Sequence, residues 1–448
     1  MTDNTTLPRG TNLFQPLFVR NFRLLWLGSV LSFIGGQLTL IAFPWLVLKL
    51  TGDSLAMGAV LAVAGIPRAV FMLFGGAVTD RFSALTVMIW TNWFRLVLMF
   101  GLALLLYTGM IEMWMVFVVA FIFGIADAFY WPASSAIMPK VLPVELLPAG
   151  NSLQQGLGQL SQMLGPVLAG IIIAIFSEGQ ESDLADLLGI SVVFFIDGIG
   201  FVISLAALSM IRLDKEIVEQ GSLDFASMIE SIREGFTAAW NDVPVRLITI
   251  LFAIFSLFYR GPFLVGIPIL SDVRFEEGAL AYGMITSSFG IGAMLGLLIA
   301  GSFPKPSERF LGILILGDFA VLGAGFIAFA LTTHLEVAMF FSGLGGLTDG
   351  YMVIILISWL QTRIPIKLMG RVMSVIMVFW IGLTPVTAAA AGLLIRWSVG
   401  GVFIGAGFIL IGLSLIGFLV PVVRRLGIEA ERVELNELKE TGAKQRAD

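Results

Sequence analysis

The chain has no cysteine and a single histidine among its 448 residues. Without cysteine, disulfides and thiolate chemistry are excluded, and without clusters of His and Cys a zinc-type metal site is excluded too. A Gly-rich phosphate loop ending in Lys-Ser/Thr is also missing, which argues against direct drive by ATP. We therefore expect no metal, no cofactor and no enzyme activity.

Charged residues are scarce, at 13% of the chain against about 25% in ordinary soluble domains. Hydrophobic residues make up 58%, and the charges are excluded from about twelve windows long enough to span a bilayer. The 50 glycines suit close helix packing in lipid. These features predict an all-α integral membrane protein with about twelve transmembrane helices. We expect no cleavable signal, because residues 1–19 are polar and the first apolar run is too long.

The basic residues predict the orientation. Of the 26 Lys and Arg, about twenty fall in the tails and the even-numbered loops. Only Lys49, Arg274 and Arg396 fall on the other side, and loop 177–188 is acidic with no basic residue. The positive-inside rule then places both termini in the cytoplasm of a cell (inner) membrane protein.

Two copies of one pattern divide the chain. Gly124-Ile-Ala-Asp127 is repeated as Gly346-Leu-Thr-Asp349, 222 positions later. Gly58, Gly65 and Gly76 recur as Gly283, Gly290 and Gly301 at an offset of 225, and Arg95 corresponds in depth to Asp318 with the opposite charge. These repeats predict two six-helix bundles of parallel topology with a substrate site near the midplane.

The expected organisation has five parts. A break in the hydrophobic pattern separates the bundles, and within it apolar residues recur at helical spacing from Phe225 to Trp240, as in an amphipathic helix on the membrane surface. The expected parts are an N-terminal tail at 1–21, a bundle at 22–211, a linker at 212–243, a second bundle at 244–425 and a C-terminal tail at 426–448.

A carboxylate deep inside a membrane helix is expensive unless it meets a partner or water, so Asp127 and Asp349 are candidates for function. Because burial favours the neutral form of a carboxyl group, both are candidates for proton coupling. Of the two, Asp127 has the stronger claim from its position, and Asp127→Asn is expected to impair proton-coupled transport while leaving folding nearly intact. Asp349→Asn is expected to do less harm. Packing against a polar neighbour, without a role in transport, is the alternative for each.

The chain resembles the major facilitator superfamily, and most closely its drug:proton antiporter-like branch of macrolide-efflux and enterobactin-exporter type. The resemblance spans residues 20–425 and rests on Asn21-Phe-Arg-Leu-Leu-Trp-Leu-Gly, Trp131-Pro-Ala, Gly76-Ala-Val-Thr-Asp80-Arg81 and Gly165-Pro166-Val-Leu-Ala-Gly170. The resemblance implies the two-bundle major facilitator fold.

The resemblance also implies roles for residues. Gly76, Asp80 and Arg81 would form a cytoplasmic gate, although Ser83-Ala-Leu stands where a basic residue normally follows. Gly165, Pro166 and Gly170 would form the antiporter motif, with Ser161 in place of one usual glycine. The helices that line the cavity in that family would place these residues at the substrate: Arg68, Phe43, Trp45, Tyr130, Trp131, Tyr259, Arg260, Tyr351 and Trp380. Arg95, Asp197 and Asp318 fall on outer helices, where structural pairing is the expected role.

The function that fits best is secondary active export of a hydrophobic or amphipathic small molecule by proton antiport with alternating access. A facilitator or flippase for a lysophospholipid-like lipid is one alternative, and a non-transporting membrane receptor or scaffold is another. The expected partners are the substrate, protons and the lipid bilayer, with no nucleic acid and a monomeric chain. A balance of two arginines and two aspartates in the cavity predicts a neutral, zwitterionic or weakly cationic substrate.

Overall fold

The computed structural model of the protein describes residues 14–177, 183–213, 225–303, 306–307 and 310–420. Within these ranges the regular structure is helical, and no strand occurs. Most of the expected N-terminal tail, all of the expected C-terminal tail and residues 214–224 of the expected linker lie outside the described residues. The chain forms two compact units, Met1–Gly52 with Val63–Leu223, and Asp53–Ala62 with Asp224–Asp448.

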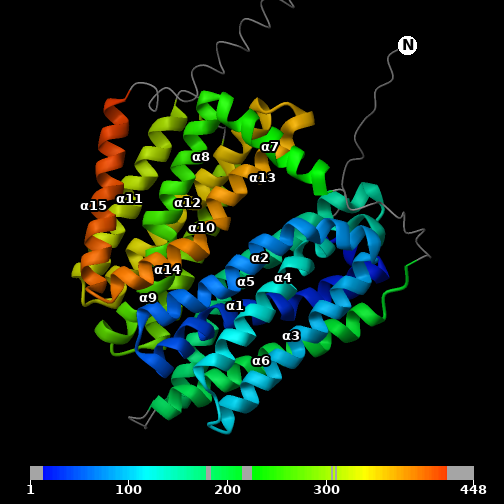
Figure 1. The fold of residues 1–448 in the computed structure, drawn as a ribbon, viewed down its shortest axis with the longest axis horizontal. Helices are drawn as coiled ribbons and strands as arrows, with labels where there is room; N and C mark the ends of the chain where they lie inside the picture. The colour runs from blue at the N-terminus through cyan, green and yellow to red at the C-terminus, as the bar shows by residue number, and fades with distance from the viewer. Residues whose placement is uncertain (1–13, 178–182, 214–224, 304–305, 308–309, 421–448) are drawn as a thin grey trace, which may run out of the picture. The chain divides into compact units, whose positions relative to one another are not determined.

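The first unit is built from long helices (Figure 1). In it α6 packs between α1 and α3, while α5 packs on α1 and α4 on α3. The helices are η1 Gln15–Phe18, α1 Arg20–Thr51, α2 Ser54–Arg81 (whose residues up to Ala62 belong to the second unit), α3 Ala84–Tyr107, α4 Met113–Val141, η2 Val144–Leu146, α5 Leu147–Ser177 and α6 Asp183–Ser209.

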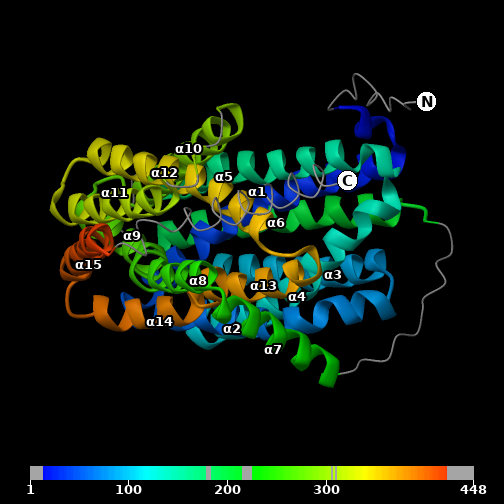
Figure 2. The same cartoon turned by 90° about the horizontal axis from the view of Figure 1, so that it is seen from above.

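The second unit contains two helices that are interrupted by short π-helical segments. In it α10 lies beside α12 in both views, and α11 packs on α12 and α15 (Figure 2). The helices are α7 Phe225–Asn241, α8 Val243–Phe255, η3 Ser256–Arg260, α9 Gly261–Arg274, α10 Ala279–Ser302, α11 Leu311–Leu331, α12 Leu335–Arg363, α13 Ile366–Met377, η5 Val378–Gly382, α14 Thr384–Ile395 and α15 Val399–Leu419.

Twelve helices of the described chain are long and apolar enough to cross a membrane. Three of them are composite, since Val144–Phe176 joins η2 and α5, Val243–Arg274 joins α8, η3 and α9, and Leu368–Ile395 joins α13, η5 and α14. The expectation of an all-α membrane protein with twelve spans is therefore confirmed for the described residues.

The amphipathic segment of the linker forms α7, which lies against α13. Its contact is close because Gly235 faces the backbone carbonyl of Arg371, where a Cβ atom would collide. Glu234 and Arg371 form an ion pair beside this contact. These contacts attach α7 to the second unit.

The glycines of the repeated Gly-x-x-Asp pattern make equivalent close contacts in the two units. A Cβ atom at Gly124 would collide with the carbonyl oxygen of Ala64 on α2, and one at Gly346 with that of Phe289 on α10. Ala64 and Phe289 are 225 positions apart, which is the offset of the neighbouring glycine repeats. In both units, therefore, the glycine brings two helices together and the aspartate follows one turn later.

Gly346→Ala is expected to destabilise the protein by about 1–3 kcal/mol or more, because the added methyl group meets backbone that has no rotamer to change. The measurement is the thermal unfolding temperature of the purified protein in detergent. Gly317→Ala on α11 is the matched control, since no neighbouring atom lies within 4 Å of its Cβ position. Equal unfolding temperatures for the two variants would show that the α10–α12 contact is not tight.

Candidate functional site

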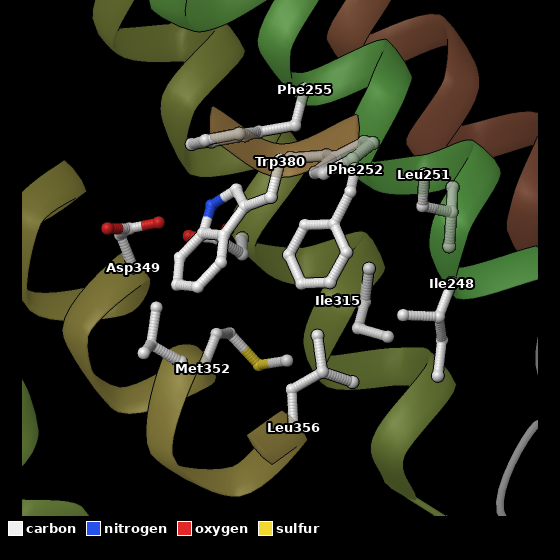
Figure 3. Close-up of a pocket in the computed structure, with 12 residues that line it drawn as sticks. Ile248, Leu251, Phe252, Phe255, Ile315, Asp349, Met352, Leu356 and Trp380 are labelled. Atoms are coloured by element: carbon white, nitrogen blue, oxygen red, sulfur yellow. The ribbon is translucent and has the colours of Figure 1, made fainter. Parts of the chain in front are cut away.

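A pocket with an empty volume of about 440 Å³, which includes the part open to solvent, lies within the second unit. It combines a largely apolar lining with two carboxyl groups (Figure 3). Figure 3 shows the Trp380 ring between Asp349 and Phe252, with Met352 and Leu356 farther along α12. The lining residues are Ile248, Leu251, Phe252, Phe255, Ile315, Asp318, Phe319, Asp349, Met352, Val353, Leu356 and Trp380.

Helical spacing explains why these side chains meet. Side chains three or four residues apart lie on one face of an α-helix. On α12 the lining residues are Asp349, Met352, Val353 and Leu356, while Gly346 of the same helix faces α10. The lining residues of α8 and of α11 follow the same spacing. The α10–α12 contact, made by Gly346 and Gly350, thus lies directly beside the α12 residues that line the pocket.

Two π-helical segments border the pocket and contact each other, η3 ending at Arg260 and η5 centred on Trp380. The Trp380 ring stacks on Phe252 at 5.2 Å between centroids, and the Arg260 guanidinium carbon lies 5.9 Å from the Trp380 centroid. A π-helical turn inserts an extra residue and often occurs at functional sites. Here it places a large aromatic ring and a cation beside the two carboxyl groups.

Asp318 is the buried member of the carboxyl pair. It is 7% exposed, and its Oδ1 atom has no hydrogen-bond partner among the described residues. Asp349 is half-buried and acts electrostatically on Asp318, while Arg260 acts on Asp349. A buried polar atom without a partner is unfavourable and calls for an explanation. The unpartnered Oδ1 atom of Asp318 is enclosed by the protein, and the described residues supply no hydrogen-bond donor for it.

The first unit surrounds its own aspartate with arginines. Arg95 on α3 donates to Oδ1 of Asp127, and Arg68 on α2 places Nη1 3.7 Å from Oδ2. The Arg95 side chain is 6% exposed and that of Arg68 is 41% exposed. Asp127 is thus held in a three-helix ion-pair cluster, although the sequence presents it as an isolated acidic group.

Aromatic rings complete the surroundings of Arg95. Its guanidinium carbon lies 4.2 Å from the Tyr130 ring centroid, 5.6 Å from that of Phe123 and 5.8 Å from that of Phe201. Cations are attracted to the faces of such rings. Asp197 on α6 acts electrostatically on this cluster and accepts a 2.6 Å hydrogen bond from Thr39.

The chain matches the Major Facilitator Superfamily over residues 25–386. It belongs to that superfamily. The expected major facilitator fold is therefore confirmed, and the chain is a multi-pass membrane protein of a transporter family rather than an enzyme.

Relatives within the superfamily include drug-efflux proteins. Macrolide efflux protein A of Streptococcus pyogenes is 23% identical over 358 residues, which cover 79% of this chain and 84% of the relative. The multidrug efflux pump Tap of Mycolicibacterium fortuitum is 24% identical over 347 residues, which cover 76% and 81%.

Solved structures of the same fold cover nearly the whole chain. A mutant of the nucleoside transporter NupG aligns with a TM-score of 0.70 at 13% identity, covering 88% of this chain and 99% of that one. A POT family transporter in complex with a thioalcohol-conjugated peptide aligns with a TM-score of 0.65 at 15% identity, covering 90% and 95%. At these identities the likeness concerns the fold alone.

In this major facilitator protein the remaining residues expected at the substrate are dispersed. Trp45 is 1% exposed and its Nε1 lies 3.3 Å from Asp186, so it belongs to the core of the first unit. Tyr130 is buried under Arg95, and Tyr259 is buried in a stack with Phe255 and Phe326. The more accessible members are Phe43 and Tyr351, which are half-buried, and Trp131, which is exposed.

The structure describes the antiporter motif fully but the expected cytoplasmic gate only in its backbone. Gly165 packs against the Gln37 side chain of α1, and Pro166 and Gly170 are buried along α5. The antiporter pattern thus lies where α5 meets α1. Gly76, Asp80 and Arg81 belong to the last turns of α2, and their side chains lie outside the described part of the chain. Their role as a gate stays a prediction.

The sequence assigned Asp318 to outer-helix packing, whereas the structure brings it to the same pocket as Asp349. A signal was available, because Asp318 is the counterpart of Arg95, and Arg95 pairs with the counterpart of Asp349. A residue that takes the place of a partner to one aspartate is expected to lie near the other. The repeat offsets indicate this neighbour only once Arg95 is known to pair with Asp127, and they do not indicate a pocket.

Proposed function

We propose that this major facilitator protein exports hydrophobic or amphipathic small molecules in exchange for protons. The observation that carries the proposal is the pocket of the second unit, where aromatic and aliphatic walls surround carboxyl groups. Flat aromatic surfaces accept many apolar shapes, and a small number of polar groups orients the ligand. Relatives named as macrolide and multidrug efflux proteins support export as the direction.

Asp349 is the proposed proton carrier. It is half-buried, faces the pocket and lies near a second carboxyl group. Asp127 has a different proposed role, because its ion pairs with Arg68 and Arg95 stabilise the charged form and join α2, α3 and α4. The positive-inside distribution supports a cell-membrane protein with both termini in the cytoplasm. Transport proceeds by alternating access.

The test uses proteoliposomes with an acidic lumen, in which the purified protein is oriented with its cytoplasmic side outward. Doxorubicin, a fluorescent aromatic amphiphile, and radiolabelled erythromycin are the probes. Uptake into the lumen is expected to follow the proton gradient and to collapse when a protonophore is added. Uptake that persists with the protonophore would instead favour a facilitator. If the protein transports a labelled lysophospholipid but neither of the two probes, the result would support the lipid alternative.

Trp380→Ala is expected to weaken the apparent affinity for the transported probe about tenfold, because it removes the largest ring of the pocket wall. The measurement is the concentration dependence of uptake in the same vesicles. Trp397→Ala is the matched control, since Trp397 is 82% exposed after the end of α14 and does not line the pocket. Equal losses of apparent affinity in the two variants would show that the pocket does not bind the substrate.

A further inference from the structure

The second unit contains another pocket, which shares no lining residue with the pocket of Asp349. Its empty volume is about 480 Å³, which includes the part open to solvent. The floor is apolar and buried, because Leu311, Ile355 and Trp359 are at most 8% exposed. Hydroxyl groups stand at the rim. The lining residues are Pro306, Ser307, Leu311, Ile355, Ser358, Trp359 and Thr362.

Helix α12 forms a wall of both pockets. Met352 and Leu356 line the first pocket, whereas Ile355 and Trp359 line the second. The members of each pair are four residues apart, so each pair lies on one face of the helix. A group that occupies the second pocket therefore contacts the same turns of α12 that present side chains to the first.

The end of α15 lies level with the second pocket. Helices α11 and α15 lie side by side (Figure 1) and are antiparallel. A Cβ atom at Gly323 would lie 2.7 Å from the carbonyl oxygen of Gly407, and one at Gly417 would lie 2.3 Å from the Leu316 side chain. When this register is continued, the end of α15 comes beside the first turn of α11. That turn contributes Leu311 to the pocket.

The chain continues beyond α15 into residues 421–448, which lie outside the described residues. Within them, residues 429–440 contain five acidic and two basic side chains, and we call this stretch the acidic segment. It also contains Leu435 and Leu438. Leucines at this spacing share one face of a helix. The acidic segment therefore combines an apolar pair with a negative net charge.

The acidic segment can reach the pocket. The chain between Leu419 and Leu435 spans about 24 Å as a helix and about 50 Å when it is extended. Since the segment is tethered to α15, its local concentration at the pocket is on the order of millimolar. A contact of modest strength is therefore sufficient to hold it there.

Charge at this end of the second unit complements the acidic segment. Residues 303–310 and 361–371 contain five basic side chains and one acidic side chain. Two of the basic residues belong to ion pairs, Arg363 with Asp242 and Arg371 with Glu234. A positive excess remains after these pairs are counted. Opposite charges favour the encounter of two surfaces and their orientation.

We propose that the acidic segment docks on the second unit at this pocket, with Leu435 and Leu438 against the floor formed by Leu311, Ile355 and Trp359. The docked segment joins the start of α11 to the last turns of α12. It thereby acts on the helix that carries Asp349 without contacting the transported molecule. The inference does not depend on the proposed function, because it concerns a contact of the chain with itself.

The absence of native cysteine allows a direct test with spin labels. One nitroxide is attached at Gln361→Cys, which is exposed on α12 and does not line the pocket. The other is attached at Glu437→Cys, between the two leucines. Pulsed electron paramagnetic resonance on the full-length protein in lipid nanodiscs measures the distance between them. We expect a narrow distance distribution, whereas a tail without a fixed position gives a broad one.

A tail variant tests the leucines without changing a membrane helix. Leu435→Asp combined with Leu438→Asp is expected to broaden the distance distribution at least twofold. Ala443→Asp combined with Ala447→Asp adds the same charge outside the acidic segment and should leave the distribution narrow.

A pocket variant tests the other side of the contact. Ser358→Trp fills the pocket from its rim and is expected to cause the same broadening. Ser374→Trp is the matched control, because Ser374 is exposed on α13 and does not line the pocket. Thermal unfolding shows whether each variant is folded. If Ser358→Trp does not fold, the tail variant still tests the inference.

Four results would overturn the inference. The first is a broad distribution in the parent protein, and the second is a narrow one that survives in the leucine variant or in folded Ser358→Trp. The third is a narrow distance that appears only when chains labelled at one site are mixed with chains labelled at the other, which would indicate docking between copies. The fourth is a phospholipid that native mass spectrometry detects on the parent but not on Ser358→Trp, while the tail distribution stays broad in both.

Discussion

Asp127→Asn is expected to lower the free energy of unfolding by about 3–5 kcal/mol, which is the usual effect of removing one partner from a buried ion pair. The variant leaves the Arg95 guanidinium charged, 6% exposed and without its carboxylate. The Nε atom of Arg95 already lacks a hydrogen-bond partner among the described residues. Lower yield and a lower unfolding temperature of the purified protein in detergent are the measurements.

Two controls define this effect. The double variant Arg95→Gln with Asp127→Asn is expected to be more stable than Asp127→Asn alone, because it removes the unpaired buried charge. Asp53→Asn makes the same substitution in an ion pair with Arg396, whose side chain is 50% exposed, and should change stability by less than about 1 kcal/mol. An Asp127→Asn protein that unfolds at the parent temperature would show that the cluster does not stabilise the first unit.

Asp349→Asn is expected to reduce substrate-driven proton flux at least tenfold while the protein remains folded. Asparagine keeps the size of the side chain but cannot carry the proton. Removing one of two neighbouring carboxyl groups also relieves their repulsion, and Asp318 remains close to this site. Proteoliposomes with a trapped pH indicator report the flux when doxorubicin is added.

Asp349→Glu is the matched control, because it retains the carboxyl group and should retain much of the flux. An Asp349→Asn protein with parental flux would contradict the assignment of the proton to this residue. The order that we now propose for the two aspartates is the reverse of that expected from the sequence, where Asp127 ranks first in coupling and Asp349 is the milder site. The arginines around Asp127 are the physical reason for the change.

The membrane fold could be predicted without a structure, because hydrophobic windows and the exclusion of charge act locally along the chain. Backbone groups in lipid must bond within their own segment, so each window forms a helix whatever its neighbours are. The internal repeat could also be recognised in the sequence, and the close contacts of Gly124 and Gly346 follow its offsets. The resemblance to the major facilitator superfamily rested on motifs of the same local kind.

Which charged side chains meet could not be predicted in this way. Which side chains meet depends on the rotation of each helix about its axis, and this rotation is set by packing contacts such as those of Gly346 on α10. Those contacts pair Asp127 with Arg95, bury Trp45 and Tyr259 away from the pocket, and bring Asp318 beside Asp349. A single charge at mid-depth looks the same in sequence whether it meets a cation, a second carboxyl group or an open pocket.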